Sequence, residues 1–210
     1  MLPQGAAQCK RVDMAVGLKK TVALVGMMGA GKTAVGKALA QKCGVEFLDS
    51  DAEIEKAANC SIAEIFTDYG EAFFRDKETL VISRLLDSKK VVLSTGGGAF
   101  LSRVNRDMIA EKGVAVWLKA DLDILWNRVR HKNTRPLLRT DNPYETLREL
   151  MRTRTPFYEE AGIIVEAELS LSIEGMADKV IDALRDYGGI LDEDCPPKPA
   201  SSETGVEAKE

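Results

Sequence analysis

The segment 26–33 has the sequence Gly-Met-Met-Gly-Ala-Gly-Lys-Thr, which is the composition and spacing of a phosphate-binding loop. Its glycines allow a tight turn in which consecutive backbone N–H groups point at phosphate oxygens, and the helix expected next presents its positive end to the same anion. Lys32 is placed to reach the β and γ phosphates of a nucleotide, and the Thr33 hydroxyl is placed to hold Mg2+. We therefore predict a nucleotide site made by Gly29, Ala30, Gly31, Lys32, Thr33 and Ala34.

Two carboxylates, Asp49 and Asp51, follow the next apolar run. If the strand continues through them, residues two apart project from the same face. One carboxylate would then meet Mg2+ and the other a substrate hydroxyl, which is the pairing that phosphoryl transfer requires. Helix capping is an equally open interpretation, because an Asp directly before a helical stretch is a normal N-cap.

Gly96, Gly97 and Gly98 follow a third apolar run, residues 91–94. Consecutive glycines do not stabilise a strand, but they let a backbone approach another group closely. A flexible loop is the alternative interpretation. The position at the carboxyl end of a predicted strand favours a ligand platform whose N–H groups bind a carboxylate or a hydroxyl.

Several arginines have the geometry to bind an acidic ligand. Arg75, which has acidic neighbours, is by itself an ordinary surface residue, and Arg154 lies in a basic helical stretch where solvated charge is the default. Arg135 lies in a basic segment, about 130–142, that we predict to be a lid closing on the phosphates and excluding water.

Short apolar strands alternating with helices must position these residues. Strands are predicted at 21–25, 45–48, 91–94, 114–118 and 163–165, and helices at 33–43, 52–58, 61–68, 71–87, 102–111, 121–130, 143–160 and 172–186. Near-continuous apolar strands separated by helices indicate a parallel sheet covered on both faces. In such a doubly wound α/β fold, ligands bind beyond the carboxyl ends of the strands, where the candidate residues lie.

Composition limits the classes of function. The chain has 210 residues, 45% of them hydrophobic, and a formal net charge of -4, so that one core is expected and nucleic acid is not expected as a partner. No apolar stretch has the length of a membrane span or the form of a signal peptide, so we expect a cytoplasmic protein without a membrane partner. Residues 1–19 and the proline-containing, acidic segment 188–210 are predicted to be flexible, which leaves one domain, 20–187.

The cysteines and the single histidine do not suggest a metal site. The four cysteines show no Cys-x-x-Cys spacing, and we expect them to be inert reduced thiols. His131 has no evident carboxylate partner and is expected to point to solvent.

In this order, the motifs resemble those of shikimate kinases. The match runs from about Lys20 to about Tyr187 and comprises the segments 26–33, 47–51, 70–75, 95–98, 135–138 and 154–158. The resemblance implies an ATP-dependent kinase that phosphorylates the 3-hydroxyl of shikimate, giving shikimate 3-phosphate and ADP on the route to chorismate and the aromatic amino acids. It also implies a three-layer P-loop kinase fold of the nucleoside monophosphate kinase group, with a five-stranded parallel sheet, a substrate-binding helical region and a lid.

On the acceptor side, the resemblance implies that Asp51 contacts the substrate hydroxyls and is the candidate base. Arg75 and Arg154 are expected to hold the shikimate carboxylate, with Gly97 and Gly98 beside them. A planar guanidinium binds a carboxylate through two parallel hydrogen bonds, so this pair would select an acidic substrate and orient it.

On the donor side, Asp49 is expected near Mg2+, together with Thr33. Arg135 is expected to contact the nucleotide phosphates, and Arg130 takes the approximate place of an arginine that faces adenine. Lys32, Asp51 and Arg135 are then the expected catalytic residues. The site would be complete within one chain, so we expect a monomer that uses ATP as co-substrate and Mg2+ as cofactor.

Two other functions fit the phosphate loop alone. A gluconate kinase of the same fold would keep the loop but has less reason to combine the acidic pair, the glycines and the two arginines. A regulatory GTPase would need an Asn-Lys-x-Asp motif, which the chain lacks, and its one Asp-x-x-Gly, residues 186–189, lies beyond the last predicted helix.

Overall fold

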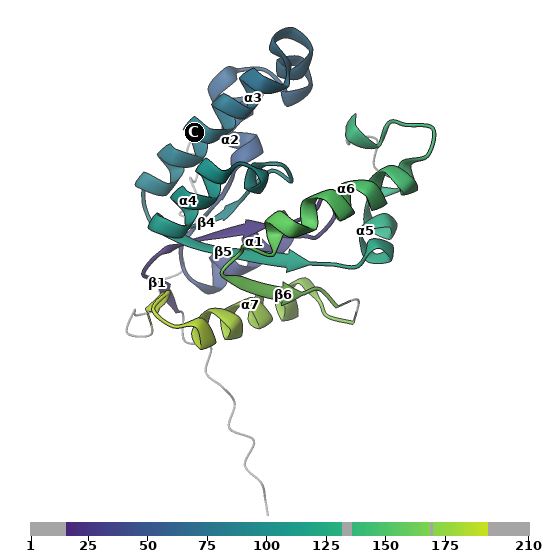
Figure 1. The fold of residues 1–210 in the computed structure, drawn as a ribbon. Coiled ribbons are helices and arrows are strands. Elements are labelled where there is room, and N and C mark those ends of the chain that lie inside the picture. Colours follow the sequence, from purple (N-terminus) through teal and green to yellow (C-terminus); the bar gives the residue numbers. More distant parts are fainter. Residues whose placement is uncertain (1–15, 132–135, 169, 193–210) are drawn as a thin grey trace, which may run out of the picture.

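Five parallel strands form the central sheet, in the order β3-β4-β2-β5-β6 (Figure 1). The computed structural model describes residues 16–131, 136–168 and 170–192. Every residue of β2 (Thr21–Val25) and β4 (Val91–Ser94) is buried, as expected for strands covered on both faces. They are flanked by β3 (Glu46–Asp49) on one side and by β5 (Gly113–Lys119) and β6 (Ile163–Glu166) on the other.

Helices cover both faces of the sheet and complete three layers. On one face, α1 (Lys32–Lys42) packs against α7 (Ile173–Tyr187), and on the other, α4 (Arg103–Lys112) packs against β5 and against α3 (Ile62–Asp87). A short 3-10 turn, Ala99–Leu101, joins β4 to α4. Beyond β5 lie α5 (Leu122–Val129), a second 3-10 turn (Pro136–Leu138) and α6 (Pro143–Tyr158). The predicted three-layer fold with a five-stranded parallel sheet is confirmed.

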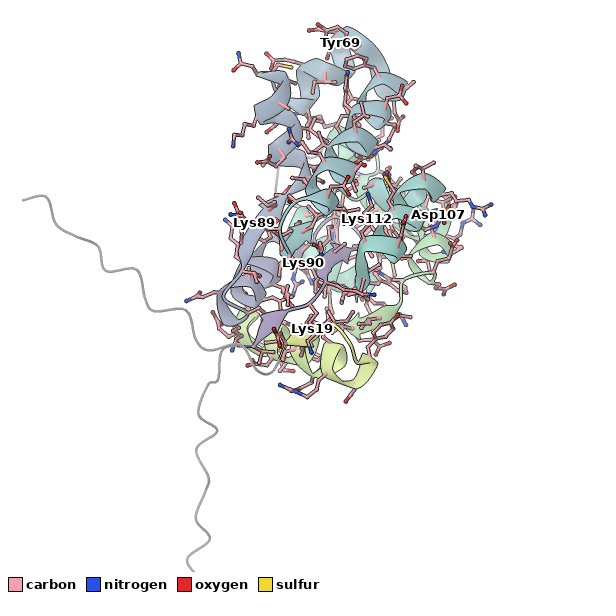
Figure 2. All side chains as sticks on the ribbon, turned by 90° about the vertical axis from the view of Figure 1, so that its left-hand side faces the viewer. Lys19, Tyr69, Lys89, Lys90, Asp107 and Lys112 are labelled. Carbon is pink, nitrogen blue, oxygen red and sulfur yellow. The ribbon has the colours of Figure 1, made fainter. Side chains whose placement is uncertain are left out.

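A helical region made of α2 (Ser50–Ala58) and the first part of α3 projects from the sheet (Figure 1). Tyr69 marks its far end in Figure 2. Ser61 begins α3 with a capping box to Glu64, which satisfies backbone N–H groups that a helix start leaves open. Within α3, the non-helical Gly70, with φ 81 and ψ 174, separates two helical segments, as predicted for 61–68 and 71–87.

The two ends of the described chain form a short antiparallel ribbon. Here β1 (Gly17–Leu18) pairs with β7 (Leu191–Asp192), and the Lys19 N–H donates to the Ile190 carbonyl at 2.7 Å. These residues lie in segments predicted to be flexible, so the packed part of the chain extends beyond the predicted 20–187. Within the three described ranges, no helix has the length and apolar character needed to cross a membrane.

Candidate active site

The phosphate loop follows β2 and ends at the first turn of α1. Gly26, Gly29 and Gly31 all have positive φ values, 133, 84 and 99, which residues with a side chain rarely adopt. Gly31 is the N-cap of α1 and has no side chain to cap the helix, so the first N–H groups remain directed at the loop. The buried Lys32 ammonium donates to the carbonyls of Gly26 at 2.8 Å and Met27 at 3.1 Å. The loop therefore already has the form of an anion cradle.

A pocket of about 430 Å³ opens in front of this loop. Its walls are the phosphate loop, Asp49 and Asp51 at and after the end of β3, and the start of the glycine platform (residues 96–98) after β4. Arg128 on α5, the residues that lead into α7 and its first turn complete the walls. The carboxyl ends of neighbouring strands thus converge on one cavity, as the doubly wound fold predicts.

The two carboxylates occupy different elements. The strand ends at Asp49, and Asp51 lies in the first turn of α2, so the expectation that both project from one strand face is wrong. Asp49 Oδ1 accepts from the Asp51 N–H at 3.1 Å as the N-cap of α2, while Oδ2 accepts from the Thr33 hydroxyl at 3.1 Å. An aspartate therefore caps the helix, but it is Asp49 and not Asp51, which directly precedes the helix predicted at 52–58. Both carboxylates still line the same pocket.

The Thr33 and Asp49 oxygens suit Mg2+, which prefers hard oxygen ligands. Among the described residues, no cluster of three or more His, Cys, Asp or Glu side chains could hold a metal. That is compatible with Mg2+, because this ion usually takes one or two protein oxygens and completes its shell with water and phosphate oxygens.

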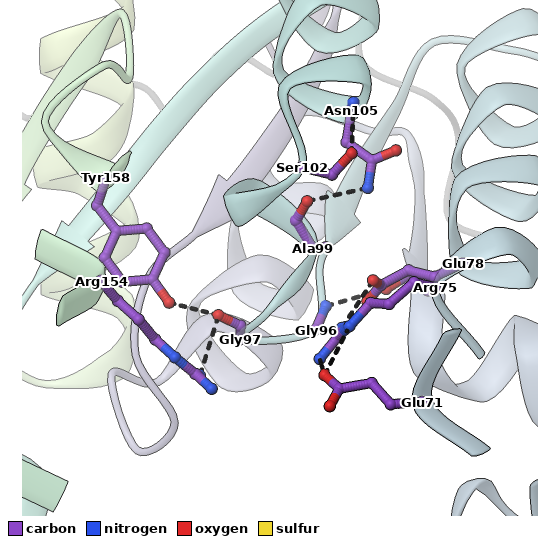
Figure 3. Close-up of polar contacts among 11 residues, drawn as sticks. Glu71, Arg75, Glu78, Gly96, Gly97, Ala99, Ser102, Asn105, Arg154 and Tyr158 are labelled. Carbon is purple, nitrogen blue, oxygen red and sulfur yellow. Dashed lines mark hydrogen bonds and ion pairs between the residues drawn. The ribbon is translucent and has the colours of Figure 1, made fainter. Parts of the chain in front are cut away.

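The glycine platform lies between side chains of α3 and side chains of α6 (Figure 3). A β-carbon placed on Gly96 would lie 2.6 Å from Asp51 Oδ1 and 3.0 Å from Glu78 Oε1, and one placed on Gly98 would lie 2.6 Å from the Arg75 guanidinium. Close approach therefore explains these glycines better than loop flexibility. The Gly96 N–H already donates to the Ser50 hydroxyl at 3.0 Å and does not point into the pocket as a ligand donor.

Arg75 is held against Gly98 by two acidic side chains of its own helix. Its Nη1 donates to Glu78 at 2.8 Å and its Nη2 to Glu71 at 3.0 Å. Glu71 is exposed, whereas the Glu78 side chain is 1% exposed and its Oε1 has no hydrogen-bond partner among the described residues. Burial raises the pKa of Glu78, against the opposing effect of Arg75, and the charge of Asp51 adds to the increase.

Glu78 was missed by the sequence reasoning as a site residue. Its spacing from Arg75 was visible, but the same spacing occurs in exposed ion pairs that contribute little. The Arg75–Glu78 pair differs from such an exposed ion pair only in the burial of the Glu78 carboxylate. That burial depends on how α3 packs, which the sequence does not show.

Arg154 is not the solvated residue that its basic neighbours suggest. It is 8% exposed and donates to the Gly97 carbonyl at 3.4 Å. Tyr158, one turn later on α6, donates to the same carbonyl at 2.5 Å (Figure 3). The two arginines predicted to bind a carboxylate thus approach neighbouring residues of one platform, Arg154 at Gly97 and Arg75 at Gly98.

The basic residues predicted in or near the lid differ in whether the structure places them at the pocket. Arg135 lies outside the described residues. Arg130 directly follows α5, is exposed and is absent from the pocket lining given by the described residues, so its contact with the nucleotide stays a prediction. Arg128 lines the pocket instead and donates to the Gly29 and Ala30 carbonyls at 3.3 and 3.2 Å. His131 is exposed, as expected.

The thiol of Cys43 fits the inert character predicted for the cysteines. It is buried, and burial raises its pKa to about 11, so it remains protonated near neutral pH. Cys60 is also a free thiol and is partly buried.

The phosphate loop, the aspartates and the arginines gathered at one edge of this parallel sheet define a P-loop kinase of small molecules. The chain belongs to the shikimate kinase family, whose model matches residues 28–185. The shikimate kinase of Ruegeria pomeroyi is 64% identical over 178 residues, which cover 85% of this chain and 91% of that relative. A solved shikimate kinase from Acinetobacter baumannii, in complex with shikimate, is 40% identical with a TM-score of 0.74, covering 78% of this chain and 91% of that one.

The rival prediction of a gluconate kinase is much less well supported. A gluconokinase from Sinorhizobium meliloti aligns with 81% of this chain and 97% of its own, but at 18% identity and a TM-score of 0.50. That likeness concerns the fold alone.

Proposed function

We propose that this protein transfers the γ-phosphoryl group of ATP to the 3-hydroxyl of shikimate, giving shikimate 3-phosphate and ADP on the route to chorismate and the aromatic amino acids. The observation that carries the proposal is the approach of Arg75 and Arg154 to two neighbouring glycines, Gly98 and Gly97, of one platform beside the phosphate loop. Two guanidinium groups so placed suit a carboxylate, and a neutral sugar would lose their hydrogen bonds.

The residues of the chain divide the chemistry between them. Lys32 and the N–H groups at the start of α1 bind the β and γ phosphates, so Lys32 exchanges its carbonyl partners for phosphate oxygens. Asp51 orients the 3-hydroxyl and accepts its proton late, because a loose transition state needs little early deprotonation. Most of the acceleration then comes from positioning and from charge stabilisation by Lys32 and, when the lid closes, Arg135. Mg2+, held by Thr33 and Asp49, supplies further neutralisation of phosphate charge when bound.

The nucleotide base has a separate part of the pocket. We assign to it the part lined by Arg128 and by the apolar side chains of Leu171, Ile173 and Met176, which lie just before α7 and in its first turn. A flat base between a guanidinium and aliphatic side chains suits adenine stacking, so we assign to Arg128 the role first given to Arg130.

The test is ADP formation by the purified chain with ATP and Mg2+. Shikimate should stimulate turnover, whereas gluconate and nucleoside monophosphates should not, and chelation of Mg2+ should abolish the reaction. Turnover on gluconate without turnover on shikimate would refute the proposal. Slow ATP hydrolysis at a rate that shikimate does not change would favour a regulatory NTPase. We expect a cytoplasmic monomer without nucleic-acid or membrane partners, and light scattering with and without both substrates tests its mass.

Arg75→Ala should raise KM for shikimate by at least about tenfold, because a charge-assisted contact to the carboxylate is lost. KM for ATP should change little, since Arg75 faces the acceptor side of the platform. Initial-rate kinetics in both substrates measure this. An unchanged shikimate KM would show that Arg75 is an ordinary surface arginine without a role in substrate binding.

A further inference from the structure

Tyr158 is a buried polar residue to which the proposed reaction assigns no role. It lies one helical turn after Arg154, so both side chains project from the same face of α6. It is 1% exposed, and its ring stacks on Trp117 of β5 with centroids 5.8 Å apart. The hydroxyl donates to the Gly97 carbonyl at 2.5 Å. The ring is thus fixed by packing, and its one polar atom is directed at the glycine platform.

The Gly97 carbonyl is shared between two donors. Arg154 Nη1 reaches it at 3.4 Å, a much longer contact than that of the Tyr158 hydroxyl. A buried carbonyl without a good donor is costly, so removal of the hydroxyl would draw the guanidinium toward Gly97. The same guanidinium is the group proposed to bind the acceptor carboxylate. The Tyr158 hydroxyl therefore leaves Arg154 available for the ligand.

Tyr158 also touches the donor side of the site. Its oxygen lies 3.9 Å from Met27 Sδ, and the Met27 carbonyl accepts from Lys32 at 3.1 Å. Burial raises the pKa of Tyr158 to about 12, so the hydroxyl keeps its proton at any pH used for assay. A permanent donor thus lies between the platform and the phosphate loop.

We propose that Tyr158 is a positioning residue that holds the Gly97 backbone and thereby orients Arg154 for the carboxylate of the acceptor. This inference rests on the proposed function, because it needs an acidic acceptor. It assigns to Tyr158 no contact with substrate, and it predicts that the effect of the hydroxyl is transmitted through Arg154.

The test is Tyr158→Phe, which removes one oxygen and keeps the ring stacked on Trp117. KM for shikimate should rise about tenfold, the size expected for one net hydrogen bond, while kcat and KM for ATP stay within about twofold. Tyr187→Phe is the matched control, since Tyr187 is exposed on α7, and its kinetics should equal those of the unaltered chain. A partly unfolded preparation lowers kcat without changing KM, so the shikimate KM remains informative if folding suffers.

A double variant separates positioning from a merely structural role. In an Arg154→Lys background, Tyr158→Phe should change the shikimate KM by less than about twofold, because the transmitting guanidinium is gone. If the KM increases of Tyr158→Phe and Arg154→Lys multiplied fully in the double variant, the proposal would be overturned. It would also be overturned if Tyr158→Phe alone left the shikimate KM unchanged, or raised KM for ATP by the same factor. If the unaltered chain does not phosphorylate shikimate in the same assay, the proposed function fails and not the inference alone.

Discussion

At the scale of single residues, Asp49 and Asp51 are the same residue type with different surroundings. Both oxygens of Asp49 accept hydrogen bonds inside the protein, from Thr33 and from the backbone of Asp51. The Asp51 carboxylate lies against Gly96 and lines the pocket. We therefore propose that position along the chain, at the end of β3 for Asp49 and in the first turn of α2 for Asp51, separates the metal-side role from the acceptor-side role.

Asp51→Asn should lower kcat by at least about a hundredfold, because the amide keeps the shape of the side chain but does not accept the hydroxyl proton. Binding of ATP, followed by calorimetry, should be unchanged. Asp76→Asn, an exposed change on α3, is the control for loss of one acidic charge near the site. Near-normal turnover of Asp51→Asn would remove this residue from the catalytic role.

Glu78→Gln should stabilise the fold and weaken shikimate binding. The native state holds the Glu78 proton more tightly than the unfolded chain does, so native stability falls as pH rises from about 4.3, the unfolded value, to the raised native pKa. Glutamine does not ionise, so at pH 7 the variant should melt above the unaltered protein, and the difference should vanish below about pH 4. KM for shikimate should rise several-fold, since Arg75 loses its buried anionic partner.

The control for this variant is Glu71→Gln, which removes the exposed partner of Arg75 and should change stability by less than about 1 kcal/mol. Thermal melts across pH, with initial rates at pH 7, measure both properties. A Glu78→Gln protein that melts lower at pH 7 would show that the ion pair with Arg75 outweighs the burial of the carboxylate.

At the scale of elements, the break at Gly70 sets the direction in which α3 returns toward the site. Its φ of 81 and ψ of 174 lie in a region that is essentially reserved for glycine. The break lies five residues before Arg75 in the sequence. A change of backbone angle there therefore moves the helix segment that carries this guanidinium and Glu78.

Gly70→Ala should cost about 1–3 kcal/mol of stability from backbone strain alone, because a β-carbon there would meet no atom within 4 Å. It should also raise KM for shikimate, since relief of the strain reorients the second part of α3. Gly188→Ala is the matched control, with φ 78, ψ 156 and equally open space at the end of α7. In denaturant unfolding, Gly188→Ala should lose a similar amount of stability, but its KM for shikimate should not change. If both variants had the same KM for shikimate, the break at Gly70 would have no role in placing Arg75.

The order of strands and helices was predictable because each is long enough to show an apolar run or a helical period. The phosphate loop was predictable because its glycines and Lys32 have fixed offsets. The remaining site residues could not be predicted, because their roles depend on which side chains the packed helices bury. Glu78 resembles a surface ion pair until α3 is packed, and the choice between Arg128 and Arg130 depends on which side of α5 faces the phosphate loop. The strands β1 and β7 have two residues each, too few for any periodicity.

At the scale of the whole molecule, we propose that one domain carries the activity and that residues 16–192 are sufficient for it. A chain limited to 20–187, the range expected from sequence, should melt at a lower temperature than 16–192. It loses the β1–β7 pairing and the burial of Leu18, Ile190 and Leu191. Calorimetric melts with steady-state kinetics on both chains measure this, and equal melting temperatures would show that the ribbon contributes nothing.

The antiparallel ribbon of β1 and β7 fixes where the two ends of the described chain lie. Because Gly17 lies opposite Asp192, the described chain starts and finishes at one place. That place lies where β2 begins, near Lys19 in Figure 2, whereas the pocket lies beyond the carboxyl ends of the strands. Neighbouring termini are the condition for circular permutation and for fusion to another domain. A short linker from 192 to 16, with new termini opened in an exposed turn such as 88–90, therefore leaves every group of the active site in its present order around the pocket.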